Sequence, residues 1–325
     1  MVDAEDGEAV AGGDQGLGRQ KQQKQSEQQK STGAEHDEQV VSFREIGVCE
    51  SVFANKRGVP RQGNLAPDTL GRVVLHKHVG DAALEGLDAF SHVWIVFVFS
   101  RNTNKSKVAA WVRGDAQVIL PSKIRPPLLQ GKSTGMLSTR TPHRPNPIGL
   151  TLATVRSVDL SRRHVIVGGI DLCHLTPVLD LKPFVPGDVP LETPRFASWV
   201  LAEQNLAWTV EFTTKADQDM DELVQAGVTR FYRTVAELKR AVEQVVRLDV
   251  RAVHQGRQGI SKEPCSQPTS VSQQCVVDGI QFLFSVADSA RLATVLGARA
   301  YDEDLEGLAK GNSLKKAEPQ RPGKG

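Results

Sequence analysis

The sequence is poor in the residues on which several classes of protein depend. It holds only four cysteines, Cys49, Cys173, Cys265 and Cys275, and no two of them have the CxxC spacing. A disulfide framework or a metal site built on cysteine is therefore not expected. Buried thiols in a reducing compartment are the simpler interpretation.

A long apolar run is also missing. The longest one, Val93–Phe99, is far shorter than the roughly 20 residues of a membrane-spanning helix. The chain begins Met-Val-Asp-Ala-Glu-Asp, and these acids without an apolar segment predict neither a secretory signal nor a transit peptide. We therefore expect a cytoplasmic protein that makes no membrane contact.

Both ends of the chain are compositionally biased. Residues 1–39 are rich in Gln, Lys, Glu, Gly and Ser, and such a segment buries too little apolar surface to offset the entropy lost on ordering. We predict a disordered arm over 1–39, a disordered tail over 306–325 and a loose insertion over 254–274.

Short segments rich in Val, Ile, Phe and Thr, separated by turns, fill the chain between residues 40 and 212. Many short strands without long helical patterns between them favour a barrel or a sandwich. We therefore predict a mainly β fold with one compact domain over 40–212. The expected strands are Val41–Val48, Arg72–Val79, His92–Phe99, Gly135–Thr139, Leu150–Val158, His164–Gly168, Val178–Val185 and Ala207–Phe212.

The hydrophobic period changes after residue 212. Apolar residues recur in steps of four and three from Val224 to Val245, which indicates one face of a helix. Residues 275–284 then contain Asp278-Gly279 between two apolar runs, a strong signal for a two-residue hairpin turn. We predict a small α+β module over 213–305.

Two segments carry several hydrogen-bonding groups close to a predicted strand or turn. Gly58–Gly63 presents Pro60, Arg61 and Gln62 from a loop, although a solvated turn is the better interpretation of this loop taken alone. Ser100 and Arg101 follow the strand at 92–99, a common place for a binding residue. His92, near the start of that strand, is better explained as a structural histidine than as a base.

The loop at 138–150 combines rigidity with recognition groups. Three prolines and a glycine shape it, and it carries two arginines, a histidine, an asparagine and several hydroxyls. Because proline limits φ and removes a backbone donor, such a loop holds one shape. A functional role for this loop is the better interpretation, and an ordinary surface loop is the poorer one.

A further segment, 169–184, alternates polar with apolar residues. Asp171, Asp180 and Lys182 stand where a half-buried strand places them on one face. A strand with a solvated face and a strand that carries functional groups remain equally open here.

Positive charge gathers over residues 101–144, where nine basic residues stand against a single acid, Asp115. A phosphate backbone is the natural partner for such a segment, because each contact releases condensed counterions. A basic surface without a partner is the alternative. We predict phosphate contacts from Lys105, Lys107, Lys123 and Arg125.

Four motifs in order resemble the family of tRNA methyltransferase O proteins. They are Gly58-x-Pro-Arg-Gln62, Phe90-Ser-His-x-Trp94, Thr139-Arg-x-Pro-His-Arg-Pro-Asn-Pro-Ile-Gly-Leu150 and Thr176-Pro-Val-Leu-Asp-x-Lys-Pro183. The long Thr-Arg string is highly specific, and the match runs over about residues 43–185. Leu248-Asp-Val-Arg251 and the hairpin at 275–286 resemble that family's small appended domain more faintly.

The resemblance implies a β-barrel methyltransferase that works as a homodimer. It implies methyl transfer from S-adenosylmethionine to N6 of N6-threonylcarbamoyladenosine at position 37 of tRNA, beside the anticodon. Carried over by position, the residues that bind the cofactor are Pro60, Arg61, Gln62, Ser100, Arg101, Arg140, Leu150, His174, Leu175, Thr176 and Pro177.

Three positions depart from the family's usual pattern. Ser100 stands where a histidine is common, Leu128 where an arginine is common, and Leu175 where a glycine is common. If the backbone at 175 needs a positive φ, leucine there costs on the order of 1 kcal/mol. The departures keep two alternatives open: a non-catalytic tRNA-binding relative, and an enzyme that acts on another RNA or a small molecule.

For the reaction itself, our hypothesis is that Arg140 and Arg144 order the cofactor and the acidic threonylcarbamoyl group, since arginine binds carboxylates with two donors. Asp171 or His143 would accept the proton that leaves the acceptor nitrogen. All of this requires that the loop at 139–150 and the Thr176-Pro177 turn shape one pocket.

Overall fold

The computed structural model describes residues 40–101, 105–113, 121–126, 129, 131–201, 208–248 and 273–302. Most of the predicted arm at 1–39, the tail at 306–325 and the insertion at 254–274 lies outside them, as do Leu128 and Cys265. The chain divides into two units, Met1–Ser42 and Phe43–Gly325. All the helices and strands below belong to the second unit.

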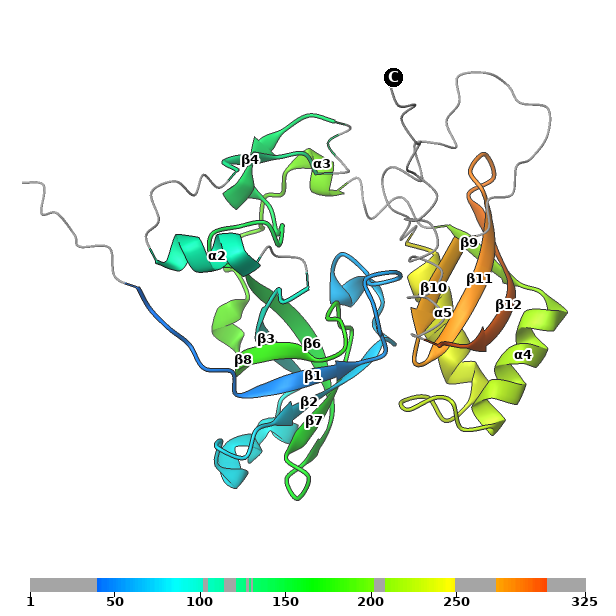
Figure 1. Ribbon diagram of the computed structural model, residues 1–325, viewed down its shortest axis with the longest axis horizontal. Coiled ribbons are helices and arrows are strands. Elements are labelled where there is room, and N and C mark those ends of the chain that lie inside the picture. The colour runs from blue at the N-terminus through cyan, green and yellow to red at the C-terminus, as the bar shows by residue number, and fades with distance from the viewer. Residues whose placement is uncertain are drawn as a thin grey trace, which may run out of the picture. The chain divides into compact units, whose positions relative to one another are not determined.

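Six antiparallel strands close into a barrel (Figure 1). Around the barrel they follow the order β1-β2-β7-β6-β3-β8, and β8 closes the ring by pairing with β1. The mainly β fold that the strand pattern predicts is therefore confirmed, and of its two forms the barrel is the one observed. The strands are β1 (Gly47–Ser51), β2 (Leu70–Leu75), β3 (His92–Val98), β6 (Ile148–Asp159), β7 (His164–Gly168) and β8 (Thr176–Pro183).

Alternation along each strand places one set of side chains inside the barrel. On β3 the residues Val93, Ile95 and Phe97 are almost completely buried, while their neighbours are half-exposed. β3 pairs with β6 on one side and with β8 on the other, as its apolar sequence predicts for a central strand. A register shift between Val96 and Phe97 bends β3 near its end.

A second sheet contains β9 (Thr209–Phe212), β10 (Gln273–Val277), β11 (Ile280–Ala287) and β12 (Leu292–Ala300), in the order β10-β11-β12-β9. The strand expected at 207–212 therefore lies here, parallel to β12, and does not continue the barrel. We propose that the boundary between the two parts of the chain precedes β9 rather than following residue 212. The helices α4 (Thr214–Gln225) and α5 (Val235–Val246) pack on this sheet (Figure 1).

The single helical face predicted from Val224 to Val245 is wrong, because two helices share it. α4 ends before Gly227, whose φ of 72° is left-handed. α5 begins at a capping box, in which Thr234 accepts from the backbone N–H of Glu237 and the Glu237 side chain accepts from that of Thr234. Both are strong boundary signals.

The predicted hairpin is confirmed. Val277 pairs with Ile280, and the two residues between them, Asp278 and Gly279, have φ of 49° and 78°. Positive φ at both positions is the condition for a type I′ turn.

Shorter elements complete the described chain: α2 (Lys105–Val112), β4 (Lys123–Ile124), β5 (Thr134–Gly135) and α3 (Ser198–Leu201), with 3₁₀ turns at residues 63–65, 81–84, 87–89, 136–138 and 186–188. The strand predicted at Gly135–Thr139 is wrong, since β5 stops at Gly135 and a 3₁₀ turn follows. The strand expected at Val41–Val48 begins only at Gly47.

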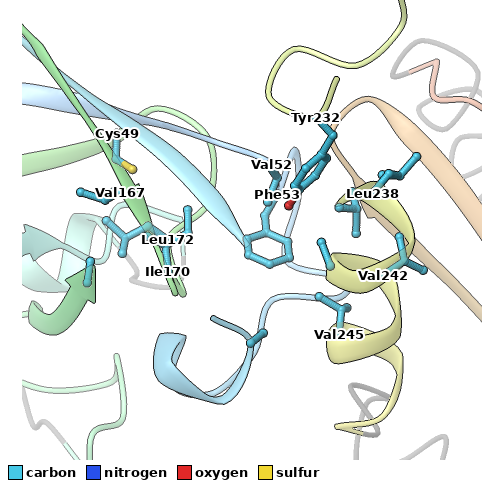
Figure 2. Packing of buried hydrophobic residues seen from close by; sticks show 14 of the residues in the cluster. Cys49, Val52, Phe53, Val167, Ile170, Leu172, Tyr232, Leu238, Val242 and Val245 are labelled. Carbon is cyan, nitrogen blue, oxygen red and sulfur yellow. The ribbon is translucent and has the colours of Figure 1, made fainter. Parts of the chain in front are cut away.

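One hydrophobic core runs from the barrel into the second sheet and its helices. Figure 2 shows Phe53, just after β1, extending toward Val242 and Val245 of α5, and all three are fully buried. Cys49 and Cys275, two of the four cysteines, are buried thiols in this core. In the part of the chain that the structure describes, no helix has both the length and the apolar character that crossing a membrane requires.

Candidate functional site

The pairing of the barrel strands brings four loops together at one end of the barrel. The last residue of β3, Val98, pairs with the first residue of β6, Ile148, and Phe97 pairs with Val178 near the start of β8. Cys49, near the end of β1, pairs with Thr176. The loops that leave β1 and β3, and those that lead into β6 and β8, therefore meet at this end.

These loops enclose an open hollow of about 1620 Å³. It brings together ten of the predicted catalytic and cofactor-binding residues, so the loop at 139–150 and Thr176 share one pocket, as expected. Those residues are Pro60, Arg61, Gln62, Ser100, Arg101, Arg140, Arg144, Leu150, Asp171 and Thr176.

The proline-rich loop that enters β6 holds its shape through bonds within itself. Thr139 donates to the carbonyl of Met136 over 2.7 Å, and its Oγ1 accepts from the N–H of Thr141. Arg144 Nη1 donates to the carbonyl of Thr139 over 3.3 Å. This guanidinium therefore ties the two ends of the turn together, while the side chain of Arg140 is exposed.

The glycine that follows this loop is required by the barrel core. Gly149 pairs with Phe97 across the β6–β3 ladder. A Cβ at 149 would lie 2.2 Å from the nearest atom of the Phe97 ring, closer than two carbon atoms can approach. Only glycine lets the loop enter β6 directly over this aromatic ring.

Arg101 joins two of the loops around the hollow. Its Nη1 donates to the carbonyl of Ala54 over 2.8 Å, and its Nη2 donates to the carbonyl of His174 over 3.0 Å. Both bonds come from one planar guanidinium, which suits two acceptors held at a fixed spacing. Arg101, predicted to bind a cofactor, therefore positions the walls of the hollow.

Asp171 is the carboxylate of the hollow. It lies in the loop between β7 and β8, so the strand that its alternation with Asp180 and Lys182 suggested begins only at Thr176. Burial raises the pKa of Asp171 to about 6, against opposing effects of a Thr151 hydrogen bond and the Arg140 charge. Its Oδ1 is buried without a hydrogen-bond partner among the described residues.

A carboxylate with these properties is suited to proton transfer or to a cationic ligand. A pKa near 6 leaves it ionised at neutral pH, yet basic enough to take a proton. Asp180 and Lys182 instead form an ion pair of 2.8 Å on β8.

Three of the predicted cofactor residues, His174, Leu175 and Pro177, do not line the hollow. His174 Nδ1 accepts from the N–H of Ser51 at 3.3 Å, and Pro177 pairs with Val48 in the barrel. Leu175 is half-exposed and has a φ of 60°. Its N–H donates to the carbonyl of Cys49 over 2.8 Å, which holds the strained backbone against β1.

The predicted RNA-binding residues lie around the hollow and near it. Arg125 lines it, and Lys123 stands exposed two residues earlier on β4. Lys107 is exposed on α2, and Lys105 begins the same helix, although its side chain lies outside the described part. His92 lies at the start of β3, where its Nδ1 stands 2.9 Å from Ser91 Oγ, and its structural role stays a prediction.

Sequence reasoning missed several residues of the hollow. Trp199 and Val200 of α3 line it, although they follow β8 in a stretch without a periodic pattern. An isolated tryptophan in a polar, proline-containing segment was the available signal. Phe97, Phe99 and Leu172 supply apolar lining. Because they are apolar and pack in or against the core, the sequence did not distinguish them from ordinary core residues.

The family model for the tRNA-methyltransferase O N-terminal domain matches residues 48–188. This range contains all the barrel strands except the first residue of β1, and the four loops of the hollow.

Several relatives are named for one activity. The tRNA (adenine(37)-N6)-methyltransferase of Escherichia coli K12 is 34% identical over 182 residues, which are 55% of this chain and 72% of that protein. The human protein of the same name is 38% identical over 164 residues, which are 50% of this chain and 33% of that protein. This chain thus spans about a third of the human, rat and mouse relatives that it matches.

A protein of Pseudomonas aeruginosa whose name describes an S-adenosylmethionine-dependent methyltransferase is 34% identical over 217 residues, 66% of this chain and 83% of that protein. Among solved structures, the chain is similar to a crystal structure of TrmO from Pseudomonas aeruginosa, and the match covers 82% of this chain and 100% of that chain. It has a TM-score of 0.59 at 25% identity. The likeness therefore extends past the barrel into the second sheet.

Proposed function

Because the chain belongs to the tRNA-methyltransferase O family, we propose that it is an S-adenosylmethionine-dependent tRNA (adenine-N6) methyltransferase acting at position 37. The finer proposal is that the acceptor is N6 of N6-threonylcarbamoyladenosine beside the anticodon. The relatives' names support the methyl donor and the tRNA position.

The observation that carries the proposal is the convergence on one hollow of the 139–150 loop, the 60–62 loop, the end of β3 and Asp171. The residues present fit such a cofactor. Phe97, Phe99 and Leu172 offer apolar surface for a nucleoside. Asp171 also lines the hollow, and its Oδ1 has no hydrogen-bond partner in the described part of the chain, so a positively charged group bound nearby would be stabilised. When bound, S-adenosylmethionine supplies an electrophilic methyl group on a positively charged sulfur.

The chain's own residues then mainly position the reactants, which accounts for much of the rate in a displacement that must be in line. We assign cofactor contacts to Pro60, Arg61, Gln62, Ser100, Leu150 and Thr176, which all line the hollow. His174, Leu175 and Pro177 would act through the backbone behind it. Arg101 would hold the walls at their spacing.

For the acceptor, the exposed Arg140 is suited to the carboxylate of the threonylcarbamoyl group, because a guanidinium offers two parallel donors. Arg144, already bonded to Thr139, would support the same loop. Asp171 would take the proton from the acceptor nitrogen, and its raised pKa makes it a better base than an ordinary aspartate. His143, the other candidate base, is exposed in the same loop and also lines the hollow.

Lys105, Lys107, Lys123 and Arg125 would contact phosphates of the anticodon arm, and a homodimer is the proposed assembly. The base must be presented unstacked, as loop nucleotides of RNA often are. A cytoplasmic location agrees with this substrate.

The test is mass spectrometry of nucleosides from tRNA incubated with the protein and methyl-labelled S-adenosylmethionine. Matched tRNA with and without the threonylcarbamoyl group separates the finer proposal from the coarser one. Label in the modified adenosine of only the first tRNA is the expected result. If neither tRNA is labelled although the protein binds the cofactor, the proposed methyltransferase activity is contradicted.

One observation favours a second candidate, a non-catalytic tRNA-binding relative. Leu175 stands in a left-handed backbone conformation beside the hollow, at a position where glycine would be unstrained. Calorimetry with S-adenosylmethionine distinguishes the two, since saturable heat is expected of the enzyme and none of the alternative.

A further inference from the structure

The segment Ser51–Gln62 belongs both to the hollow and to the contact with the C-terminal part, residues 208–302. Its last residues, Val59–Gln62, line the hollow. Its first residues, Ser51–Asn55, bond to side chains and backbone more than 170 positions later in the sequence. This short segment therefore connects the hollow with the C-terminal part.

Three hydrogen bonds fasten the first half of the segment. The N–H of Asp278, in the hairpin turn, donates to the carbonyl of Val52 over 2.7 Å. Arg230 Nη2 donates to the carbonyl of Ser51 over 3.1 Å. Asn55 Nδ2 donates to the hydroxyl of Tyr301 over 3.3 Å.

Apolar packing continues the attachment toward the hollow. Phe53 is fully buried in one cluster with Val242 and Val245 of α5 (Figure 2). Gly58, only two residues before Pro60, has a φ of 89°. A Cβ there would lie 2.9 Å from Cβ of Cys275 and 3.5 Å from Cγ1 of Val245. The chain thus passes the C-terminal part at the closest approach that its backbone allows.

The same segment sets the position of Arg101. The carbonyl of Ala54, between Phe53 and Asn55, accepts from Arg101 Nη1, and the carbonyl of His174 accepts from Nη2. Through Arg101, the segment that contacts the second sheet is therefore also connected to the loop that precedes β8.

We propose that the C-terminal part is a scaffold that positions the wall of the hollow, with Tyr301 and Gly58 as positioning residues. They touch no reactant, and they act through the segment at 51–62. The affinity effect rests on the proposed function, whereas the effect on the segment itself does not.

The experiment compares Tyr301→Phe and Gly58→Ala with Thr213→Ala in the full-length protein. Tyr301→Phe removes only the hydroxyl that Asn55 bonds, and Gly58→Ala introduces both the close contact and the strained φ. Thr213→Ala is the matched control, because it removes the N-cap of α4 and a bond to Leu296, away from the segment. Hydrogen exchange of peptides covering 54–62 and the Kd of S-adenosylmethionine are measured for all three.

Tyr301→Phe is expected to speed exchange over 54–62 and to raise the Kd about threefold. Gly58→Ala is expected to raise it about tenfold or more. Thr213→Ala should lower the melting temperature and leave both readouts at the wild-type value. At saturating cofactor, kcat of Tyr301→Phe should be near that of the wild type.

Unchanged exchange and Kd in Tyr301→Phe would overturn the inference, even if Gly58→Ala does not fold. Equal changes in Thr213→Ala would also overturn it, because they would show general loosening. If the wild type binds no S-adenosylmethionine, the proposed function fails, while the exchange rates still decide the role of the scaffold.

Discussion

Arg101 and His174 are joined across the end of the barrel, where Nη2 of the arginine donates to the backbone carbonyl of the histidine over 3.0 Å. The other arm of the same guanidinium reaches Ala54. Two loops that are 120 positions apart in the sequence therefore share one side chain. The charge of this residue matters less than its planar, two-armed shape.

Arg101→Lys should therefore fail to replace the arginine, although it keeps the charge. A lysine ammonium is a point donor that cannot hold two carbonyls at a fixed spacing. We expect kcat/KM to fall by about tenfold, mainly through the KM of the cofactor. Arg113→Lys, an exposed arginine that does not line the hollow, should show the wild-type value. Wild-type kinetics in Arg101→Lys would count against the positioning role.

Asp171→Asn should remove the proton acceptor and lower kcat by about 100-fold or more. In the wild type, kcat/KM should fall as the pH drops through about 6, because the carboxylate with the raised pKa is protonated below that value. Asp180→Asn, which alters an exposed carboxylate paired with Lys182, is the control and should keep both rate and profile. An acid limb that persists unchanged in Asp171→Asn would assign the base elsewhere.

Asp171→Asn should also stabilise the fold near neutral pH. The pKa of Asp171 is about 6 in the native protein, and its ordinary value of 3.8 applies to the unfolded chain. The native protein therefore holds its proton more tightly, and the free energy of unfolding falls as the pH rises from about 4 to about 6. Removing the charge should restore on the order of 2 kcal/mol at pH 7.5 and almost nothing near pH 4. Urea unfolding at both pH values measures this difference, and an equal effect at the two would contradict it.

Leu175→Gly tests the strain beside the hollow. Leucine at a φ of 60° is unfavourable, and this side chain is 52% exposed, so little buried surface is lost. The relief of strain exceeds the added chain entropy of glycine, and we expect a gain of up to about 1 kcal/mol in the free energy of unfolding.

The control for Leu175→Gly is Leu160→Gly, a similarly exposed leucine that is not among the residues with positive φ. There the substitution should destabilise, by about 0.5–1 kcal/mol. Cofactor affinity measured on Leu175→Gly also addresses the non-catalytic alternative, which predicts that a relieved backbone restores binding.

Charge reversal on the basic surface tests the RNA contacts. Lys123→Glu and Arg125→Glu should weaken tRNA binding and flatten the dependence of log Kd on log salt by about one for each lost phosphate contact. Lys77→Glu, an exposed lysine outside the hollow, should lower affinity little and leave the slope unchanged. A slope that stays constant in all three variants would remove these residues from the interface.

Local signals in the sequence predicted the elements that local physics controls. The apolar run at 92–99 gave β3 almost to the residue, and Asp278-Gly279 gave the hairpin, because both depend on neighbours in the chain. Closure of the barrel depends on β8 pairing with β1, more than 120 positions away. No local pattern encodes that pairing.

The same limit applies to the site. The proline-rich loop and Arg101 were found from residue chemistry, since they stand in loops at strand ends. Asp171 was found, but the strand interpretation placed it wrongly, because the turn before Thr176 includes a leucine where glycine would have marked it. Trp199 was missed because its place in the hollow comes from the path of the chain after β8.

The barrel and the four-stranded second sheet also differ in how they end. Every barrel strand has a partner on both sides, whereas among the described residues β10 and β9 each have a partner on one side only. An edge strand presents unpaired backbone amides and carbonyls with which a strand of another chain can pair, and a closed barrel has no edge strand. Between these two sheets, self-association would therefore start from β10 or β9 of the second sheet. Covering these edge strands would improve solubility without altering the barrel.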